Sequence, residues 1–115
     1  KKLLKRRHYF MAFADDVVVG MLCVDEYVRD EKTSPGIFSM YVCPSHRGLR
    51  VSSQLLDAAK GYVRGFGHDS LFLDVVVGNE RAISFYRREG FVPYGSLRVM
   101  ESDAGRQMMT MVCQL

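Results

Sequence analysis

The chain has 115 residues, 48% of them hydrophobic, and a formal net charge of +3. This length and balance are typical of a globular protein, so we expect a single domain over residues 1–115. No apolar run approaches the roughly 20 residues of a membrane span, and no secretory signal pattern opens the chain, so a membrane partner is not expected.

The cysteines predict a reducing environment. Their number is odd and each lies within an apolar run: Cys23, Cys43 and Cys113. This pattern argues against a disulfide framework, and we expect a cytoplasmic location. The sequence has no C-x-x-C motif and its three histidines are scattered, so no metal is expected as a cofactor.

Residues 1–7 hold most of the excess positive charge. The basic side chains are Lys1, Lys2, Lys5, Arg6 and Arg7. Such a cluster can contact nucleic acid, but this one lacks the interleaved aromatic residues that stack on bases. We therefore interpret residues 1–7 as the solvated end of a helix, and nucleic acid is not the expected partner.

An antiparallel hairpin is predicted next. Residues 8–14 and 17–28 are rich in strand-forming residues, and Asp15-Asp16 forms a tight turn between them. Residues 29–36 are polar and are predicted as an exposed loop. Residues 37–43 are almost continuously apolar, so we expect a central strand that is buried on both faces.

A strand, a helix and a second strand follow. Residues 51–66 show apolar residues at helical spacing, and Gly65 and Gly67 end this helix. Residues 71–77 form another apolar strand, interrupted only by Asp74. This order predicts that residues 37–43 and 71–77 are parallel neighbours joined by a right-handed crossover.

The remaining third of the chain predicts one more helix and two strands. Asn79 caps a helix that runs to Glu89, and Gly90 ends it. Residues 91–100 and 107–115 are predicted as strands, joined by a polar turn over 101–106. The fold class is therefore α+β, a mixed sheet flanked by helices.

Residues 40–56 predict a phosphate-binding turn. Pro44 ends the strand, and Ser52 or Ser53 lies near the start of the following helix. The free N–H groups of a helix start, its positive dipole end and the flanking Arg47 and Arg50 together suit a pyrophosphate. The alternative is an ordinary connection in which Ser52 or Ser53 only caps the helix. Neither a P-loop nor a G-x-G-x-x-G motif is present.

Residues 71–91 carry a second and more specific pattern: Asp74 in an apolar strand, then Asn79, Ala82, Tyr86 and Gly90-Phe91. Together with residues 42–48, this pattern closely resembles the GNAT superfamily of acetyl-CoA-dependent N-acetyltransferases, from about Tyr9 to the C-terminus. The resemblance implies a mostly antiparallel sheet whose central parallel strand pair splays apart. It also implies an opening strand and two helices that this chain largely lacks, and the sheet face left bare would favour a homodimer.

The resemblance further implies where acetyl-CoA binds as the co-substrate. The backbone of Met40, Tyr41 and Val42 would pair with the pantetheine arm, and the thioester end would be lined by Asn79, Phe85 and Tyr86. The pyrophosphate would be held by Arg47, Gly48, Leu49, Arg50, Val51, Ser52 and Ser53. The chain departs from the family pattern here, because Arg50 and Ser52 stand where the family usually has glycine and glycine or alanine.

A mechanism follows from the cost of deprotonating the acceptor, which is roughly 4.6 kcal/mol for a lysine amine and about 1 kcal/mol for an α-amine at pH 7. Asp74 is the candidate base, through a bridging water, because a carboxylate in an apolar strand loses solvation. An acidic residue here resembles the base of the branch that acetylates ribosomal-protein N-termini. Its alternative role is structural, and Asp25 and Glu26 are then the reserve bases.

Tyr86 is the candidate acid, since a phenol is protonated at pH 7 and can supply the proton that the leaving thiolate needs. Its alternative role is that of a core aromatic. Three functions remain open from the sequence. They are an N-acetyltransferase acting on a small-molecule amine or a protein N-terminus, an acyl-CoA-binding module without turnover, and a small basic nucleic-acid binder.

Overall fold

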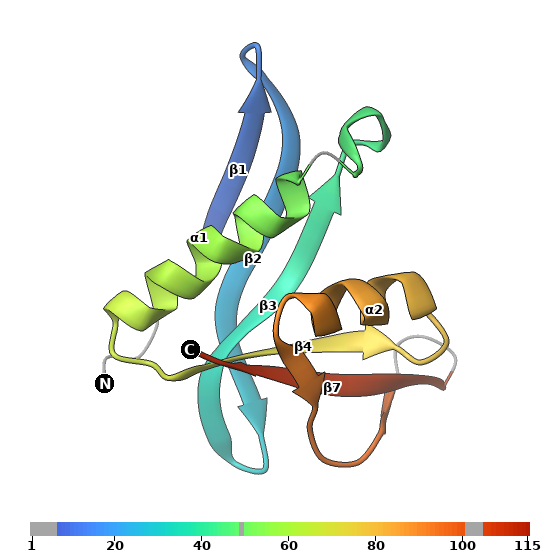
Figure 1. The fold of residues 1–115 in the computed structure, drawn as a ribbon. Helices are drawn as coiled ribbons and strands as arrows, with labels where there is room; N and C mark the ends of the chain where they lie inside the picture. Colours follow the sequence, from blue (N-terminus) through green and yellow to red (C-terminus); the bar gives the residue numbers. More distant parts are fainter. Residues whose placement is uncertain (1–6, 49, 101–104) are drawn as a thin grey trace.

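The computed structural model describes residues 7–48, 50–100 and 105–115, which build a seven-stranded sheet and two α-helices (Figure 1). The strand order is β1-β2-β3-β4-β7-β5, and β6 also pairs with β7. The strands are β1 (His8–Ala14), β2 (Val17–Arg29), β3 (Lys32–Val42), β4 (Ser70–Val76), β5 (Phe91–Pro93), β6 (Arg98–Met100) and β7 (Arg106–Gln114). The helices are α1 (Val51–Gly65) and α2 (Glu80–Arg88), with a 3-10 turn at Pro44–His46.

The first hairpin is confirmed, since β1 and β2 pair antiparallel across the turn at Asp15-Asp16. The prediction of a loop over residues 29–36 is wrong, because β2 and β3 form a second hairpin in which Arg29 pairs with Lys32. Asp30 and Glu31 both have positive φ, 52° and 65°, as two-residue hairpin turns require. Polar residues therefore continue the strand here instead of leaving the sheet.

The central parallel pair is confirmed, and it is short. The only paired positions are Gly36 with Phe72 and Ile37 with Leu73. Beyond them, residues 38–42 of β3 and 74–76 of β4 diverge and do not pair with each other, so the two strands splay apart as predicted. Burial of β3 on both faces is wrong: Phe38 is 52% exposed and Tyr41 is 53% exposed.

Helix α1 matches the predicted helix, and its buried side chains are Val51, Leu55, Leu56, Ala59 and Val63. Gly20 on β2 lets the start of this helix approach the sheet closely. A Cβ atom at Gly20 would lie 3.0 Å from a methyl group of Val51. Helix α1 therefore begins beside the end of β3, where the sheet opens.

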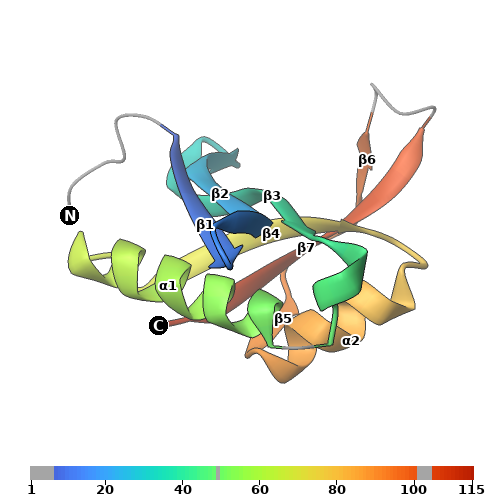
Figure 2. The same ribbon diagram turned by 90° about the horizontal axis from the view of Figure 1, so that it is seen from above.

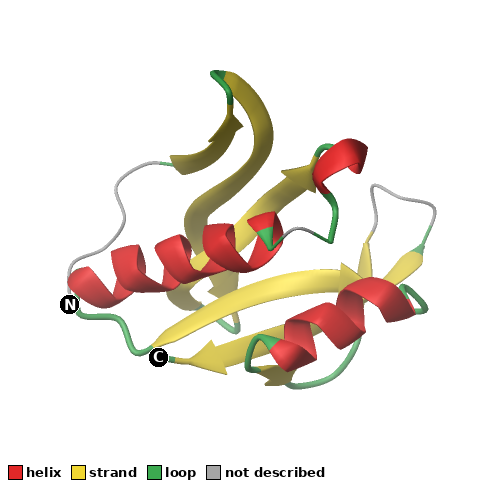
Figure 3. Cartoon of the chain, turned by 45° about the horizontal axis from the view of Figure 1, so that its top comes forward, coloured by secondary structure: helices red, strands yellow, loops and turns green. Residues whose placement is uncertain are grey.

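Helix α2 begins and ends as predicted. The Asn79 side chain accepts a hydrogen bond from the Ala82 N–H at 3.3 Å, and Gly90 follows the helix with a φ of 98°. Figures 2 and 3 show α1 and α2 on the same side of the sheet. Side chains of both helices share one core with the sheet, which includes Leu22, Leu56, Leu73, Ile83, Phe91 and Met111.

The predicted strand over residues 91–100 is instead two short strands, β5 and β6, which pair with different parts of β7. Pro93 ends β5 because it lacks a backbone N–H, and Gly95 turns the chain with a φ of 69°. The predicted final strand is confirmed as β7. Residues 101–104 of the predicted turn and residues 1–6 of the predicted helix end lie outside the described residues.

Candidate active site

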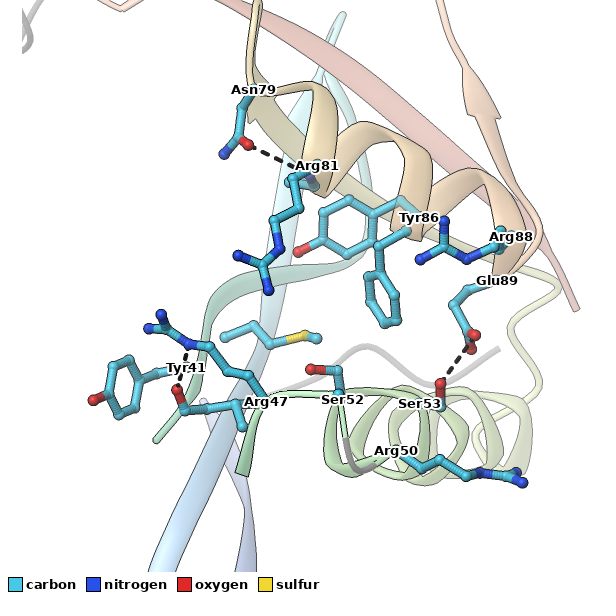
Figure 4. A pocket seen from close by; sticks show the side chains of 15 residues that line it. Tyr41, Arg47, Arg50, Ser52, Ser53, Asn79, Arg81, Tyr86, Arg88 and Glu89 are labelled. Carbon is cyan, nitrogen blue, oxygen red and sulfur yellow. Dashed lines mark hydrogen bonds between the residues drawn. The ribbon is translucent and has the colours of Figure 1, made fainter. Parts of the chain in front are cut away.

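A pocket of about 540 Å³ lies between the end of β3, the start of α1 and one face of α2 (Figure 4). Most of the residues that the sequence analysis singled out line this pocket together. The lining residues are Met40, Tyr41, Val42, Arg47, Gly48, Arg50, Ser52, Ser53, Asn79, Arg81, Ala82, Phe85, Tyr86, Arg88 and Glu89. Of the remaining candidates, Val51 is buried in the core, and Leu49 lies outside the described residues.

The start of α1 opens into this pocket without a capping side chain. The N-cap residue is Arg50, and no side chain of the described residues bonds the first N–H groups of the helix. The alternative in which Ser52 or Ser53 caps the helix is therefore wrong. Ser53 instead donates a hydrogen bond to Glu89 on the other wall, at 3.1 Å. The free N–H groups and the helix dipole make this end of the pocket favourable for an anion.

Arg50 adopts a left-handed backbone conformation, with a φ of 67°. The position at which the family pattern has glycine is thus one that needs the backbone freedom of glycine. An arginine there is strained, by an amount on the order of 1 kcal/mol. The chain therefore keeps the backbone geometry of the turn, with an arginine among the residues that line the pocket.

Four arginines and one acidic residue line the pocket: Arg47, Arg50, Arg81, Arg88 and Glu89. Among the described residues, none of these arginines forms an ion pair. Arg47 is fixed by a hydrogen bond from its Nε to the carbonyl oxygen of Val42, at 3.2 Å. Unpaired guanidinium groups around one pocket suit a ligand with several phosphate groups.

Tyr86 projects from α2 into the same pocket (Figure 4). Its ring packs edge-on against Phe91, with the ring centres 5.7 Å apart, and beside Phe85. Burial raises the pKa of the Tyr86 phenol above its usual value of about 10. The hydroxyl therefore stays protonated at neutral pH and is available as a proton donor.

Asp74 lies outside this pocket, on the opposite face of the sheet. Its neighbours on β4, Leu73 and Val75, point into the core below the helices, so the alternation of the strand turns Asp74 the other way. Its carboxylate accepts hydrogen bonds from the hydroxyls of Tyr27 and Thr110, both at 2.7 Å.

A guanidinium nitrogen of Arg98 lies 3.2 Å from the second oxygen of Asp74. The reserve candidates are not part of this arrangement. Asp25 pairs with Arg7 at 3.2 Å, and Glu26 is exposed. Asp74 is also the first residue of β4 beyond its last pairing with β3, so it stands at the point where the two strands part.

Sequence reasoning missed two groups of residues. Arg81 and Arg88 line the pocket, and their spacing with Phe85 (i, i+4, i+7) on one helix face was a signal for them. Tyr27, Arg98 and Thr110 surround Asp74, and they come from strands whose pairing the sequence did not specify.

In the basic cluster at the start of the chain, only Arg7 lies within the described residues.

Comparison with known proteins identifies the family. The model of the acetyltransferase (GNAT) family matches residues 2–91. The chain therefore belongs to this family, and the resemblance read from residues 42–48 and 71–91 is confirmed. No helix of the described residues is long and apolar enough to cross a membrane, and the described residues hold no cluster of side chains arranged to bind a metal ion.

Three similar proteins illustrate the relationship. N-alpha-acetyltransferase 30 of Schizosaccharomyces pombe is 29% identical over 89 residues, which are 76% of this chain and 59% of that protein. Nourseothricin acetyltransferase has a TM-score of 0.80 at 29% identity, over 94% of this chain and 65% of its own. A Bacillus anthracis protein described as a streptothricin acetyltransferase, solved with acetyl coenzyme A, has a TM-score of 0.81 at 17% identity, over 95% and 62%. The chain thus spans about three fifths of the length of these proteins.

Proposed function

We propose that this chain transfers an acetyl group from acetyl-CoA to a primary amine by direct attack within a ternary complex. The observation that carries the proposal is the gap between β3 and β4, which opens onto an arginine-lined pocket at an uncapped helix start. Membership of the family, and the acetyl coenzyme A bound to one similar structure, support the same substrate.

In this proposal different residues of the pocket bind different parts of acetyl-CoA. Met40 to Val42 pair with β2 but not with β4, so the backbone groups on the side of β3 that faces the gap would bind the pantetheine arm. The start of α1 and the side chains of Arg47 and Arg50 would hold the diphosphate. Arg81 and Arg88 add positive charge on the facing wall of the same pocket.

The chemistry then needs two proton transfers. The amine gives up a proton and attacks the carbonyl carbon of the thioester, the carbon–sulfur bond breaks, and the thiolate takes up a proton. Tyr86 supplies that proton from the helix side, since its phenol is protonated. Asp74 receives the amine's proton on the opposite side of the gap, directly or through a water molecule.

We further propose that the chain works as a single domain in the cytoplasm. Both helices and strands from both ends of the chain share one core, which supports one folding unit. All three cysteines are unpaired, and Cys23 and Cys113 are buried, which suits a reducing compartment.

The test is release of the CoA thiol from acetyl-CoA in the presence of a panel of primary amines. We expect release that depends on both substrates, together with an acetylated amine identified by mass spectrometry. Binding of acetyl-CoA without thiol release from any amine would overturn the proposal and leave an acyl-CoA-binding module. Binding that falls steeply with salt, to RNA or DNA only, would favour the nucleic-acid alternative.

A further inference from the structure

Five side chains from four strands meet on the sheet face opposite the helices, and we call them the far-face cluster: Tyr27, Arg29, Asp74, Arg98 and Thr110. Asp74 holds them together at the point where β3 and β4 part. A group bound at this cluster would therefore approach the gap from the side opposite the arginine-lined pocket.

Most hydrogen bonds of the cluster lead towards Asp74, and the hydroxyl oxygens of Tyr27 and Thr110 also lie 3.0 Å apart. Arg98 donates to the Tyr27 hydroxyl at 3.0 Å, and Arg29 donates to the Thr110 hydroxyl at 2.8 Å. Each hydroxyl then has its own hydrogen free to donate to Oδ1 of Asp74. Oδ2 receives only Arg98, and the side chain is 26% exposed. Asp74 is thus a fixed carboxylate with one oxygen still able to accept a hydrogen bond from an ammonium group.

The two arginines of the cluster differ in what they leave free. Arg29 is 14% exposed, and its terminal nitrogens are bound to Thr110 and to the carbonyl oxygen of Ser96. Arg98 is 44% exposed and is anchored through Nη1 alone. Within the described part of the chain, Nε and Nη2 of Arg98 have no hydrogen-bond partner. Arg29 therefore has a structural role, whereas Arg98 presents a free edge of its guanidinium to a ligand.

We propose that the acceptor is an amine that carries a carboxylate close to the amino group, the chemistry of a free amino acid. Oδ2 of Asp74 takes the ammonium group, and the free edge of Arg98 takes the carboxylate, the anion that fits a planar guanidinium best. A polycationic acceptor would instead be repelled by the two arginines of the cluster. This inference rests on the proposed acetyl transfer, and it assigns Arg98 as the residue that selects the acceptor.

The experiment compares L-alanine with L-alaninamide, which share the amine but differ in the carboxylate, and adds a diamine as the cationic probe. Acceptor KM and kcat are measured across pH, so that rates are compared for the same fraction of free amine. We expect an acceptor KM roughly 10- to 100-fold lower for the amino acid than for its amide. Titration calorimetry of both compounds into the CoA-saturated protein should give the same preference without turnover.

Two variants isolate the arginine. Arg98→Gln should raise the acceptor KM for the amino acid to the level of the amide and leave the KM for acetyl-CoA unchanged. Arg64→Gln removes the same charge from an exposed position on α1 and should change neither.

Equal use of acid and amide by the wild-type protein would overturn the inference, as would a loss in Arg98→Gln that is the same for every acceptor. Absence of acetyl transfer would contradict only the proposed function. The calorimetric comparison of L-alanine with L-alaninamide would still show whether the protein recognises the carboxylate. If Arg98→Gln does not fold, the comparison of L-alanine with L-alaninamide on the wild-type protein tests the inference.

Discussion

The two faces of the sheet hold arginines in opposite states. On the helix side, the arginines that line the pocket form no ion pair among the described residues. On the other side, Arg98 and Arg29 are tied to Tyr27, Thr110 and Asp74 in one directed network. The difference indicates that the pocket is left open for a charged ligand, whereas the far-face cluster is already organised. Pocket residues should therefore govern binding and turnover, and cluster residues should also govern stability.

The largest expected effect is that of Tyr86→Phe, which removes one hydroxyl from the pocket. We expect kcat to fall by about 10²- to 10⁴-fold, the usual contribution of a general acid. The KM for acetyl-CoA and the unfolding midpoint should change little. Tyr62→Phe, which alters an aromatic residue of α1 that stacks on His8, is the matched control and should keep its kcat.

The pH dependence adds a second measurement on Tyr86. Because burial raises the pKa of its phenol, the proton donor is present throughout the neutral range and is lost only as the pH rises through that raised pKa. The rate should therefore increase from pH 6 to 9 as the acceptor amine loses its proton. A rate that falls between pH 7 and 9 would contradict the assignment of Tyr86 as the acid.

On the far face, Tyr27→Phe should act mainly on stability. Tyr27 is 4% exposed, and its hydroxyl joins Asp74, Thr110 and Arg98. Loss of that hydroxyl removes hydrogen bonds to two charged side chains from a part-buried network and should lower the free energy of unfolding by about 1–3 kcal/mol. Urea unfolding measures the loss, with Tyr9→Phe, a half-exposed tyrosine, as the control. An unchanged midpoint would mean that the cluster is not organised as described.

The same residue predicts an alkaline limit to stability. Burial raises the pKa of Tyr27, so the folded protein holds the phenol neutral. The corresponding stabilisation is fully present below the pKa of the unfolded chain, near 10, and is lost as the pH rises through the higher folded value. Above pH 10 the wild-type protein should therefore lose more stability than Tyr27→Phe does.

Arg50 offers a smaller test within the pocket, because its backbone strain and its charge can be separated. Arg50→Gly and Arg50→Ala both remove the guanidinium, but only glycine adopts a φ of 67° without strain. We expect Arg50→Gly to be more stable than Arg50→Ala by about 1 kcal/mol. Both should bind acetyl-CoA roughly 10-fold more weakly, measured by calorimetry. Unchanged affinity for acetyl-CoA in both variants would show that the Arg50 side chain does not bind the cofactor.

The smallest expected effect concerns a thiol beside the pocket. A hydrogen bond with Ser45 lowers the pKa of Cys43, whereas burial raises that of Cys23. At pH 7.5 iodoacetamide should therefore modify Cys43 a few-fold to tenfold faster than Cys23 or the buried Cys113, as followed by mass spectrometry. Ser45→Ala should reduce the difference, and equal labelling of all three would contradict it.

The two faces also differ in how far the sequence predicts them. The pocket comes from two continuous stretches, residues 40–53 and 79–89, in which turn signals, helix periodicity and a family pattern coincide. The far-face cluster joins residues as distant as Tyr27 and Thr110, and only the strand register places them together. The sequence did not predict that register for two reasons. Polar residues continue β2 into β3 where a loop was expected, and Pro93 divides a predicted strand into β5 and β6.

The most direct test of the central claim is a crystal structure of the protein with acetyl-CoA. The account predicts the diphosphate at the start of α1, the pantetheine arm along residues 40–42, and the thioester between Tyr86 and the point where β3 and β4 part. Acetyl-CoA bound elsewhere on the molecule, with the pocket between α1 and α2 empty, would contradict it.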